Sequence, residues 1–337
     1  MSVGDSAKIG VRSYTAFAKE STFGTYATAT TAIEALSVGF KVEKESIKLE
    51  TLNRKRSFSK RVQTIQNVAG AVESYLHPQE SVLLVATAMG GGIGTASISA
   101  ATFTHSITAG NFDTSPASLS FNVRKGDTHT WEYVGGRPNV CTIAAEIGSP
   151  VTLSLEMVFK DATQLANDIS AALSVSSVIP YIYHQGSYIY AATEGALTTT
   201  AAEPIQSFEL VINNNIVSDA PARKLGTQIP DVLPPTTRNI ELTVTQRFDT
   251  TTNYQRFIQA TQGAVRLEFV GASITAATNY KWQIDLPKVF MNTPDPEIGG
   301  PGEVIQSEFT FDVIDSDINT TTGKDIGMTV INDVSAY

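Results

Sequence analysis

The sequence predicts a mainly β protein made of two tandem β-barrel or β-sandwich domains, each with one short flanking helix. Many segments alternate apolar and polar residues, the period of a strand with one wet face. Thr, Ser, Ala and Val are abundant and only 17% of the residues are charged, a composition that suits pleated, half-buried surfaces. One order of elements also occurs twice along the 337 residues, a length that agrees with two domains.

The repeated unit has two strands joined by a long loop, then a short helix, then three more strands. The first copy is expected at 36–49, 64–76, 79–89, 118–123, a strand around Trp131, and 151–161. The second copy is expected at 206–217, 237–248, 252–262, 265–270, a strand around Trp282, and 303–313. Phe40 and Phe208 mark the first strand of each copy, and the two tryptophans lie 151 residues apart. Order and spacing favour a duplication over two unrelated sandwiches in tandem.

The chain is predicted to divide into an N-terminal arm (1–34), a first domain (35–175), a second domain (176–315) and a C-terminal arm (316–337). The first arm is polar, and such arms usually order against a partner. The tail carries Asp315, Asp317 and Asp325 without the spacing of a calcium loop, and we expect it to pair with a neighbour.

The first predicted strand leads into the most distinctive local feature, a basic loop. The apolar–polar alternation of this strand, 36–49, shifts by one residue near Glu45–Ser46, which indicates a bulge. The loop carries five basic residues and no acidic one: Arg54, Lys55, Arg56, Lys60 and Arg61. The matching loop, 218–237, has four prolines, which exclude regular helix and strand, and keeps Arg223 and Lys224. We expect protein contact here; a solvated turn is the alternative, and the lone Phe58 is a poor platform for nucleic acid.

The two predicted helices follow these loops. Pro78 precedes the first, glycines 90–92 end it, and Gly263 ends the second. The Gly/Ala/Ser/Thr-rich segment 90–117 is expected to be a flexible loop that only the first copy has.

Two segments join the copies. Apolar residues at spacing four predict a helix over 162–177. Residues 180–192 are predicted to form a hairpin with Gly186 in its turn.

The net charge of −9 is unevenly distributed. Residues 1–168 carry 15 basic and 15 acidic residues, and the rest carries 9 basic and 18 acidic ones. No broad basic face for nucleic acid is therefore expected, because acidic surface repels phosphate. The segment MSVGDSAKIG has no basic and apolar signal pattern and no run of about 18 apolar residues occurs, so we expect a chain made in the cytoplasm without a membrane span.

No motif predicts catalysis or a cofactor. Cys141 lies in an apolar strand and is interpreted as a small buried hydrophobe. The segment 89–97 lacks the phosphate-loop pattern, and the four histidines show no metal-like spacing. The carboxylate pairs Glu73 with Glu132 and Glu146 with Glu156 fit outward strand positions better than an acid–base pair.

The order of elements resembles that of the tail tube proteins of long-tailed bacteriophages, over about residues 35–315. The resemblance is carried by the two-strand unit with its long loop, the helix followed by glycines, and three segments: 118-SLSFNV-123, 131-WEYVGGRPNVCTIAAEIGSPVTLSLEMVFKD-161 and 204-PIQSFELVINNNIV-217.

The resemblance implies a structural virion protein without catalysis. It implies rings, here trimeric with pseudo-six-fold symmetry, that stack into a hollow tube, with a sheet of each subunit lining the lumen. The loops 51–63 and 218–237 would reach the next ring. Expected partners are further copies of the chain and the tape measure, terminator and baseplate proteins; DNA would pass through during ejection. We also expect lumen side chains to be mostly Asp, Glu, Ser, Thr and Asn.

Three alternatives remain at this point. They are another virion β-protein, such as a capsid-decorating or baseplate protein, a carbohydrate-binding β-sandwich or adhesin, and an unrecognised hydrolase.

Overall fold

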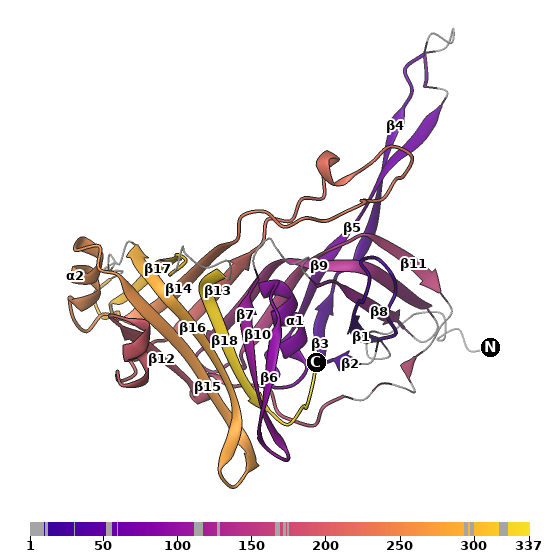
Figure 1. Ribbon diagram of the computed structural model, residues 1–337. Coiled ribbons are helices and arrows are strands. Elements are labelled where there is room, and N and C mark those ends of the chain that lie inside the picture. The colour runs from indigo at the N-terminus through magenta and orange to yellow at the C-terminus, as the bar shows by residue number, and fades with distance from the viewer. Residues whose placement is uncertain are drawn as a thin grey trace.

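The protein is mainly β, as predicted, and its strands pair antiparallel (Figure 1). The computed structural model describes residues 10, 13–29, 31–51, 56–58, 60–110, 117–126, 129–165, 169–170, 173, 175–292, 296, 300–316 and 323–337. The first half contains β1 (Tyr14–Lys19), β2 (Thr31–Ile33), β3 (Ala35–Val38), β4 (Lys41–Lys48), β5 (Arg61–Tyr75), α1 (Ser81–Met89), β6 (Ile93–Ser99), β7 (Thr102–Ala109), β8 (Leu119–Lys125), β9 (His129–Glu146), β10 (Thr152–Phe159) and β11 (Asp161–Leu165). The second half contains β12 (Gly186–Ala191), β13 (Ser207–Asn213), β14 (Asn239–Arg247), α2 (Thr252–Ile258), β15 (Gly263–Thr275), β16 (Thr278–Asn292), β17 (Gln306–Val313) and β18 (Gly323–Asn332).

One sheet runs through both halves, and we call it the main sheet. From one edge its order is β3 with β4, then β5, β10, β9, β13, β14, β17 and the end of β16. Its upper end is the one from which the β4–β5 hairpin projects (Figure 1), and its lower end is where β5 stops at Tyr75 and β9 stops at Glu146.

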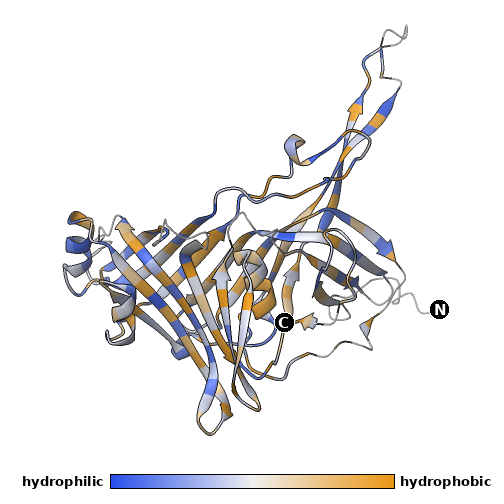
Figure 2. Cartoon of the chain, viewed as in Figure 1, coloured by the Kyte–Doolittle hydropathy of each residue, from blue (hydrophilic) through white to orange (hydrophobic). Residues whose placement is uncertain are grey.

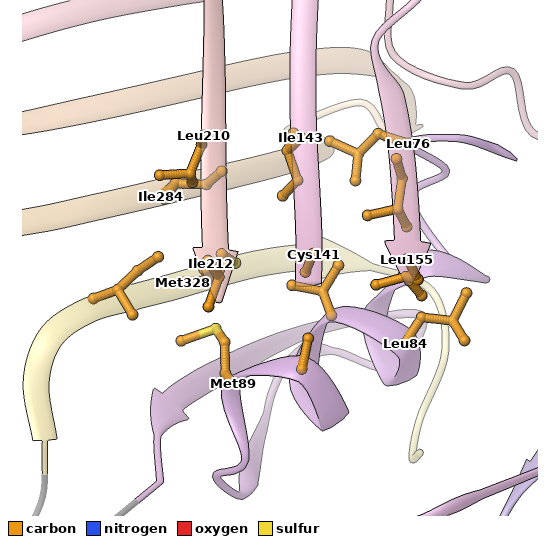
Figure 3. Close-up of a cluster of buried hydrophobic side chains, with 14 of the residues drawn as sticks. Leu76, Leu84, Met89, Cys141, Ile143, Leu155, Leu210, Ile212, Ile284 and Met328 are labelled. Atoms are coloured by element: carbon orange, nitrogen blue, oxygen red, sulfur yellow. The ribbon is translucent and has the colours of Figure 1, made fainter. Parts of the chain in front are cut away.

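The two faces of the main sheet differ because side chains alternate along each strand. One face is apolar and packs on α1 and on the second layer of strands, as Figure 3 shows for Leu84 and Met89 of α1 beneath Cys141, Leu155 and Ile212. These side chains are at most 1% exposed and belong to one core cluster that extends into both halves.

Five strand pairings of the first half have counterparts in the second half. The pairs β4–β5, β5–β10, β10–β9, β9–β8 and β9–β11 in the first half match β13–β14, β14–β17, β17–β16, β16–β15 and β16–β18 in the second. Trp131 and Trp282 take the same place in this scheme. Trp131 lies opposite β8 and β11, and Trp282 lies opposite β15 and β18. Their environments differ, since Trp282 is fully buried whereas Trp131 is half-buried under the Lys125 ammonium group, 4.9 Å from its ring.

Most predicted strands and both repeat helices are present, but several bounds differ by three to five residues. β13 ends at Asn213, before the expected residue 217, and α2 ends at Ile258. Gly263 therefore does not end the second helix, as predicted, but begins β15.

The bulge predicted near Glu45–Ser46 is confirmed as a register shift between Lys44 and Ser46. Phe40 lies in the short break between β3 and β4, packed against Phe121, Tyr133 and Phe159, and Phe208 lies within β13.

Three further local predictions were wrong. Residues 161–165 belong to the segment predicted as a linking helix, but they form strand β11 on β9. Pairing with the free edge of β9 outweighs the helix-like spacing of a few apolar residues. Gly186 does not occupy a hairpin turn; it is the first residue of β12, paired with Phe269. The predicted flexible loop after α1 contains the β6–β7 hairpin, held at its edge by β18.

Much of each predicted arm lies in the sheets of the chain itself. β1 pairs with β2 and β8, and β18 pairs with β7 and β16, so the tail links the two halves. The Tyr337 hydroxyl group also donates a hydrogen bond to the Gln79 carbonyl. The division into domains stays a prediction.

Glycines after α1 allow a close backbone contact. Gly90 ends the helix in the left-handed conformation at φ 69°, and a Cβ on Gly110 would come 2.0 Å from the Gly90 carbonyl oxygen. We expect Gly110→Ala to lower the free energy of unfolding by about 2 kcal/mol, because the two backbones must separate. Urea unfolding measures it, with Gly92→Ala as the matched control, since a Cβ there meets nothing within 4 Å. Equal effects of both changes would contradict this account.

Candidate assembly surfaces

The β4–β5 hairpin projects from the body, and we call the described residues of its protruding part, 41–51, 56–58 and 60–65, the finger (Figure 1). Every residue of β4 is exposed, and Figure 2 shows apolar segments along the hairpin as well as polar ones. Ile47 is 56% exposed and pairs with Val62, which is 46% exposed; Leu49 lies on the same face. A two-stranded ribbon is marginally stable alone, so we expect another surface to pack against this apolar face.

Three of the predicted basic residues of the finger lie near its tip. Arg56, Lys60 and Arg61 are exposed. Arg54 and Lys55 lie outside the described residues. Lys48 places its ammonium nitrogen 5.8 Å from the Phe58 ring, so the tip combines positive charge with an exposed aromatic side chain.

The second predicted contact loop, 218–237, runs along the base of the finger (Figure 1). The Gln66 N–H donates to the Gln228 carbonyl at 3.0 Å. Arg223 donates to the Gln66 and Gln228 carbonyls and to the Asn67 side chain, and Lys224 forms an exposed ion pair with Asp231 at 2.6 Å. The structure thus brings the two loops together at the upper end, where hydrogen bonds from Arg223 connect them.

The uncovered face of the main sheet is acidic. Exposed carboxylates lie on five of its strands: Glu73, Glu156, Glu209, Glu241, Glu308 and Asp312. The positions paired with them are mostly small or polar, as in the row that runs from Glu73 through Ser154, Thr142 and Val211 to Glu241 and Asp312. Lys41 and Arg247 lie at the margins of this face. Such a face repels a phosphate backbone.

The main sheet has two open edges. Among the described residues, β3 and β4 pair only with β5, and the Phe290–Asn292 end of β16 pairs only with β17. In the middle of the sheet, β13 joins the two halves by pairing with β9 from Ser207↔Glu146 to Asn213↔Val140. Open edges expose backbone donors and acceptors that favour pairing with another chain.

Two buried polar clusters hold the upper end together. The Glu20 carboxylate accepts hydrogen bonds from the Ser118 and Ser120 hydroxyl groups at 2.6 and 2.7 Å and from the Gly24 and Gly135 N–H groups at 2.9 and 2.7 Å. These contacts fix the segment after β1 on β8 and β9.

The second cluster connects both halves. Arg238 binds Asp325 through two hydrogen bonds, at 2.7 and 3.0 Å, and also donates to the Met89 and Gly110 carbonyls. Nearby, Arg137 donates to the Leu233 carbonyl and lies 4.6 Å from the Phe23 ring; burial lowers the pKa of its guanidinium group. These residues border a pocket of about 630 Å³.

The candidate chemical groups lie apart from one another. Cys141 is fully buried, and burial raises the pKa of its thiol to about 12, which suits the interpretation as a core residue. Glu73 is exposed on the acidic face, whereas burial raises the pKa of Glu132 on a different part of β9. Within the parts of the chain that are described, no group of three metal-binding side chains occurs, and no helix has the length and apolar character to cross a membrane.

Comparison with known protein families identifies the chain. A family model described as phage tail tube protein matches residues 10–313. The chain belongs to this family. A search of curated proteins finds no match. As a tail tube protein, the chain is a structural component of the virion tail, in a family that self-assembles and contacts other tail components. The predicted family is thereby confirmed, and the duplication stays a prediction.

Proposed function

We propose that three copies of this tail tube protein close into a ring with pseudo-six-fold symmetry, and that rings stack into the hollow tube through which DNA enters the host. The observation that carries the proposal is the match between the open edges of the main sheet and its internal joint. β13 is the counterpart of β3–β4, because both begin a half and pair with its second strand. β9 is the counterpart of β16.

The β9–β13 pairing inside the chain is therefore a template for the strand pairing that would join one copy to the next. The open β3–β4 edge of one copy would pair with the open end of β16 in the next, as β13 pairs with β9. A closed ring removes every open edge. Three duplicated chains give six units, and repetition of the internal rotation would close the ring.

The acidic face is assigned to the lumen. Ring closure through the main sheet leaves this face uncovered while the opposite face stays in the core. Its carboxylates, hydroxyls and amides would let DNA slide without binding its phosphates. Tape measure, terminator and baseplate proteins are the proposed tail partners, and the assembled chain would reside in the virion tail after synthesis in the host cytoplasm.

Negative-stain electron microscopy at rising protein concentration tests the proposal. We expect annular particles with three-fold averages and, at higher concentration, hollow tubes. Particles that remain monomeric at every concentration, or compact oligomers without a central channel, would overturn it. Ring averages with six similar lobes would additionally support the duplicated unit.

A further inference from the structure

We propose that the exposed side of α2 is covered by the first half of the next copy in the ring, as α1 is covered by the second half of its own chain. This inference rests on the proposed ring and adds a helix contact to its strand joint. α1 and α2 are counterparts, since each follows the second long strand of its half, β5 or β14. They differ in burial: eight of the nine residues of α1 are buried, and none of the seven residues of α2 is.

A backbone hydrogen bond of the same kind precedes each helix. The Leu76 N–H donates to the Val151 carbonyl at 2.8 Å, and the Phe248 N–H donates to the Ile305 carbonyl at 3.0 Å. Val151 lies just before β10, which pairs with β5, and Ile305 lies just before β17, which pairs with β14. Leu76 and Phe248 therefore occupy the same place in the two halves and provide a common origin for comparing the helices.

Counted from this origin, corresponding positions of the two helices differ in exposure. Val82 and Tyr254 both lie six residues after it, and Ala86 and Ile258 both lie ten residues after it. Val82 and Ala86 are 0% and 2% exposed, whereas Tyr254 and Ile258, which we call the apolar pair, are 41% and 58% exposed. Because residues four apart are neighbours on a helix, the same helix side is covered in the first half and open in the second.

The second half covers α1 beneath the β9–β13 joint. The Asn214 side chain, just after β13, donates to the Ala88 carbonyl at 2.7 Å, and Arg238 donates to the Met89 carbonyl at 3.1 Å. Figure 3 shows Ile212 of β13 above Met89. The last turn of α1 thus receives both apolar contacts and hydrogen bonds from the strand that begins the second half and from the loop that follows it.

α2 lies at the corresponding place beside the open edge. It stands at the end of the molecule formed by β17 and β16, opposite the β3–β4 edge (Figure 1). Its inner side is fixed: Phe257 packs on the core, Arg256 binds the Glu203 carboxylate at 2.8 and 3.2 Å, and the Arg256 guanidinium carbon lies 3.9 Å from the centre of the Tyr190 ring. The helix is therefore held in place on the body while the apolar pair stays exposed.

The β3–β4 edge offers a surface of matching character at the base of the finger. Val42 of β4 and Leu210 of β13 are counterparts, because each lies in a row with a buried phenylalanine, Phe159 or Phe311. Leu210 is fully buried, whereas Val42 is 40% exposed although its pair Val68 belongs to the core. Covering Val42 with the apolar pair of another copy would remove apolar area from water on both sides.

Lys44 supplies a polar contact beside Val42. It lies two residues further along β4, on the same side of the strand, and is exposed, whereas its pair Gln66 is buried. Side chains of the second half donate to the last carbonyls of α1, and the Lys44 ammonium group is the corresponding donor for the last carbonyls of α2. A cation at this end of a helix is stabilised by the helix dipole.

Cysteine crosslinking in the full chain tests this contact. Val42→Cys with Ile258→Cys places one thiol on each surface; native Cys141 is fully buried and stays unreactive. β4 and α2 lie at opposite ends of one copy (Figure 1), so a short bismaleimide reagent joins the two thiols only between copies. We expect dimers and trimers on a denaturing gel. The matched control joins Val42→Cys to Ile98→Cys on β6, where Ile98 is 50% exposed. Its crosslinked fraction should be at least about tenfold lower, since a docked pair has a high effective concentration.

Substitutions on the helix give an independent readout. Ile258→Lys should raise the protein concentration needed for rings at least about tenfold, because a covered apolar contact is lost. Ile258→Leu is the matched control; it keeps the apolar volume and should change this concentration by less than about threefold. Thermal melting of the monomer should be the same for both variants, since Ile258 is exposed in the single copy.

The role of α2 and the proposed ring can fail separately. Rings in the unmodified chain together with crosslinking no higher than in the Ile98 control would overturn the role of α2 alone, and so would rings of Ile258→Lys at unchanged concentration. The exposed side of α2 would then face a different tail component. The proposed function fails instead if the unmodified chain forms no rings.

Discussion

Leu36→Lys is expected to keep the chain monomeric at concentrations where the unmodified chain forms rings. Leu36 lies on β3 at the open edge and is 52% exposed, so the folded monomer tolerates a lysine there. In the proposed ring, the neighbouring copy would cover the same position. Loss of a buried leucine costs about 2 kcal/mol per joint, and a charge at a strand edge prevents pairing. A ring needs three such joints, so the losses combine.

Sedimentation velocity across a concentration series measures this effect. Ile98→Lys on β6 is the matched control, since Ile98 is 50% exposed and β6 pairs, among the described residues, only with β7 and not with the main sheet. Circular dichroism and thermal melting should be alike for both variants and the unmodified chain. Rings formed by Leu36→Lys at unchanged concentration would show that β3 is not a ring joint.

Glu20→Gln is expected to lower the free energy of unfolding of the monomer by about 3 kcal/mol. The native carboxylate accepts four hydrogen bonds, two on each oxygen. An amide replaces one of these oxygens by an N–H donor, which then faces a hydroxyl group and a backbone N–H. The hydroxyl group can rotate but the backbone N–H of Gly24 or Gly135 cannot, and a buried donor left unpaired costs about 1–3 kcal/mol. The loss of negative charge weakens the remaining bonds.

Urea unfolding at a protein concentration below that of assembly measures the change through the midpoint at constant slope. Glu73→Gln is the control, because Glu73 is exposed and accepts one hydrogen bond, from Ser37. Its effect should lie within about 0.5 kcal/mol of zero. Similar midpoints for the two variants would mean that the Glu20 cluster contributes little to stability.

Local sequence patterns predicted the elements whose signal is local. The period of two in 36–49 located the first strand and its bulge at Lys44–Ser46, and Gly90 located the end of α1. Segments whose structure depends on distant partners were missed. β6–β7 is held by β18, more than 200 residues later in the chain, and β11 forms because β9 offers an edge. Composition alone cannot indicate such pairings.

The candidate surfaces show the same limit. The basic residues of the finger were visible as a charge cluster, and the two contact loops were matched by position. Their meeting at the upper end, with Arg223 bound to the base of the finger, required the structure. Glu20 was missed because one glutamate in a polar segment looks solvated, and its four donors come from two strands and a turn. The Arg238–Asp325 pair likewise joins residues far apart in the sequence.

The β9–β13 joint lies within one polypeptide, so dilution can never separate it. In the proposed ring, every second strand joint would lie within one covalent chain. Disassembly would therefore release whole subunits, each one third of the ring. The two halves would also never exchange places. Each of the two long loops would therefore always have the same neighbours. The two loops could then evolve separately, one as a basic hairpin and the other as a proline-rich loop.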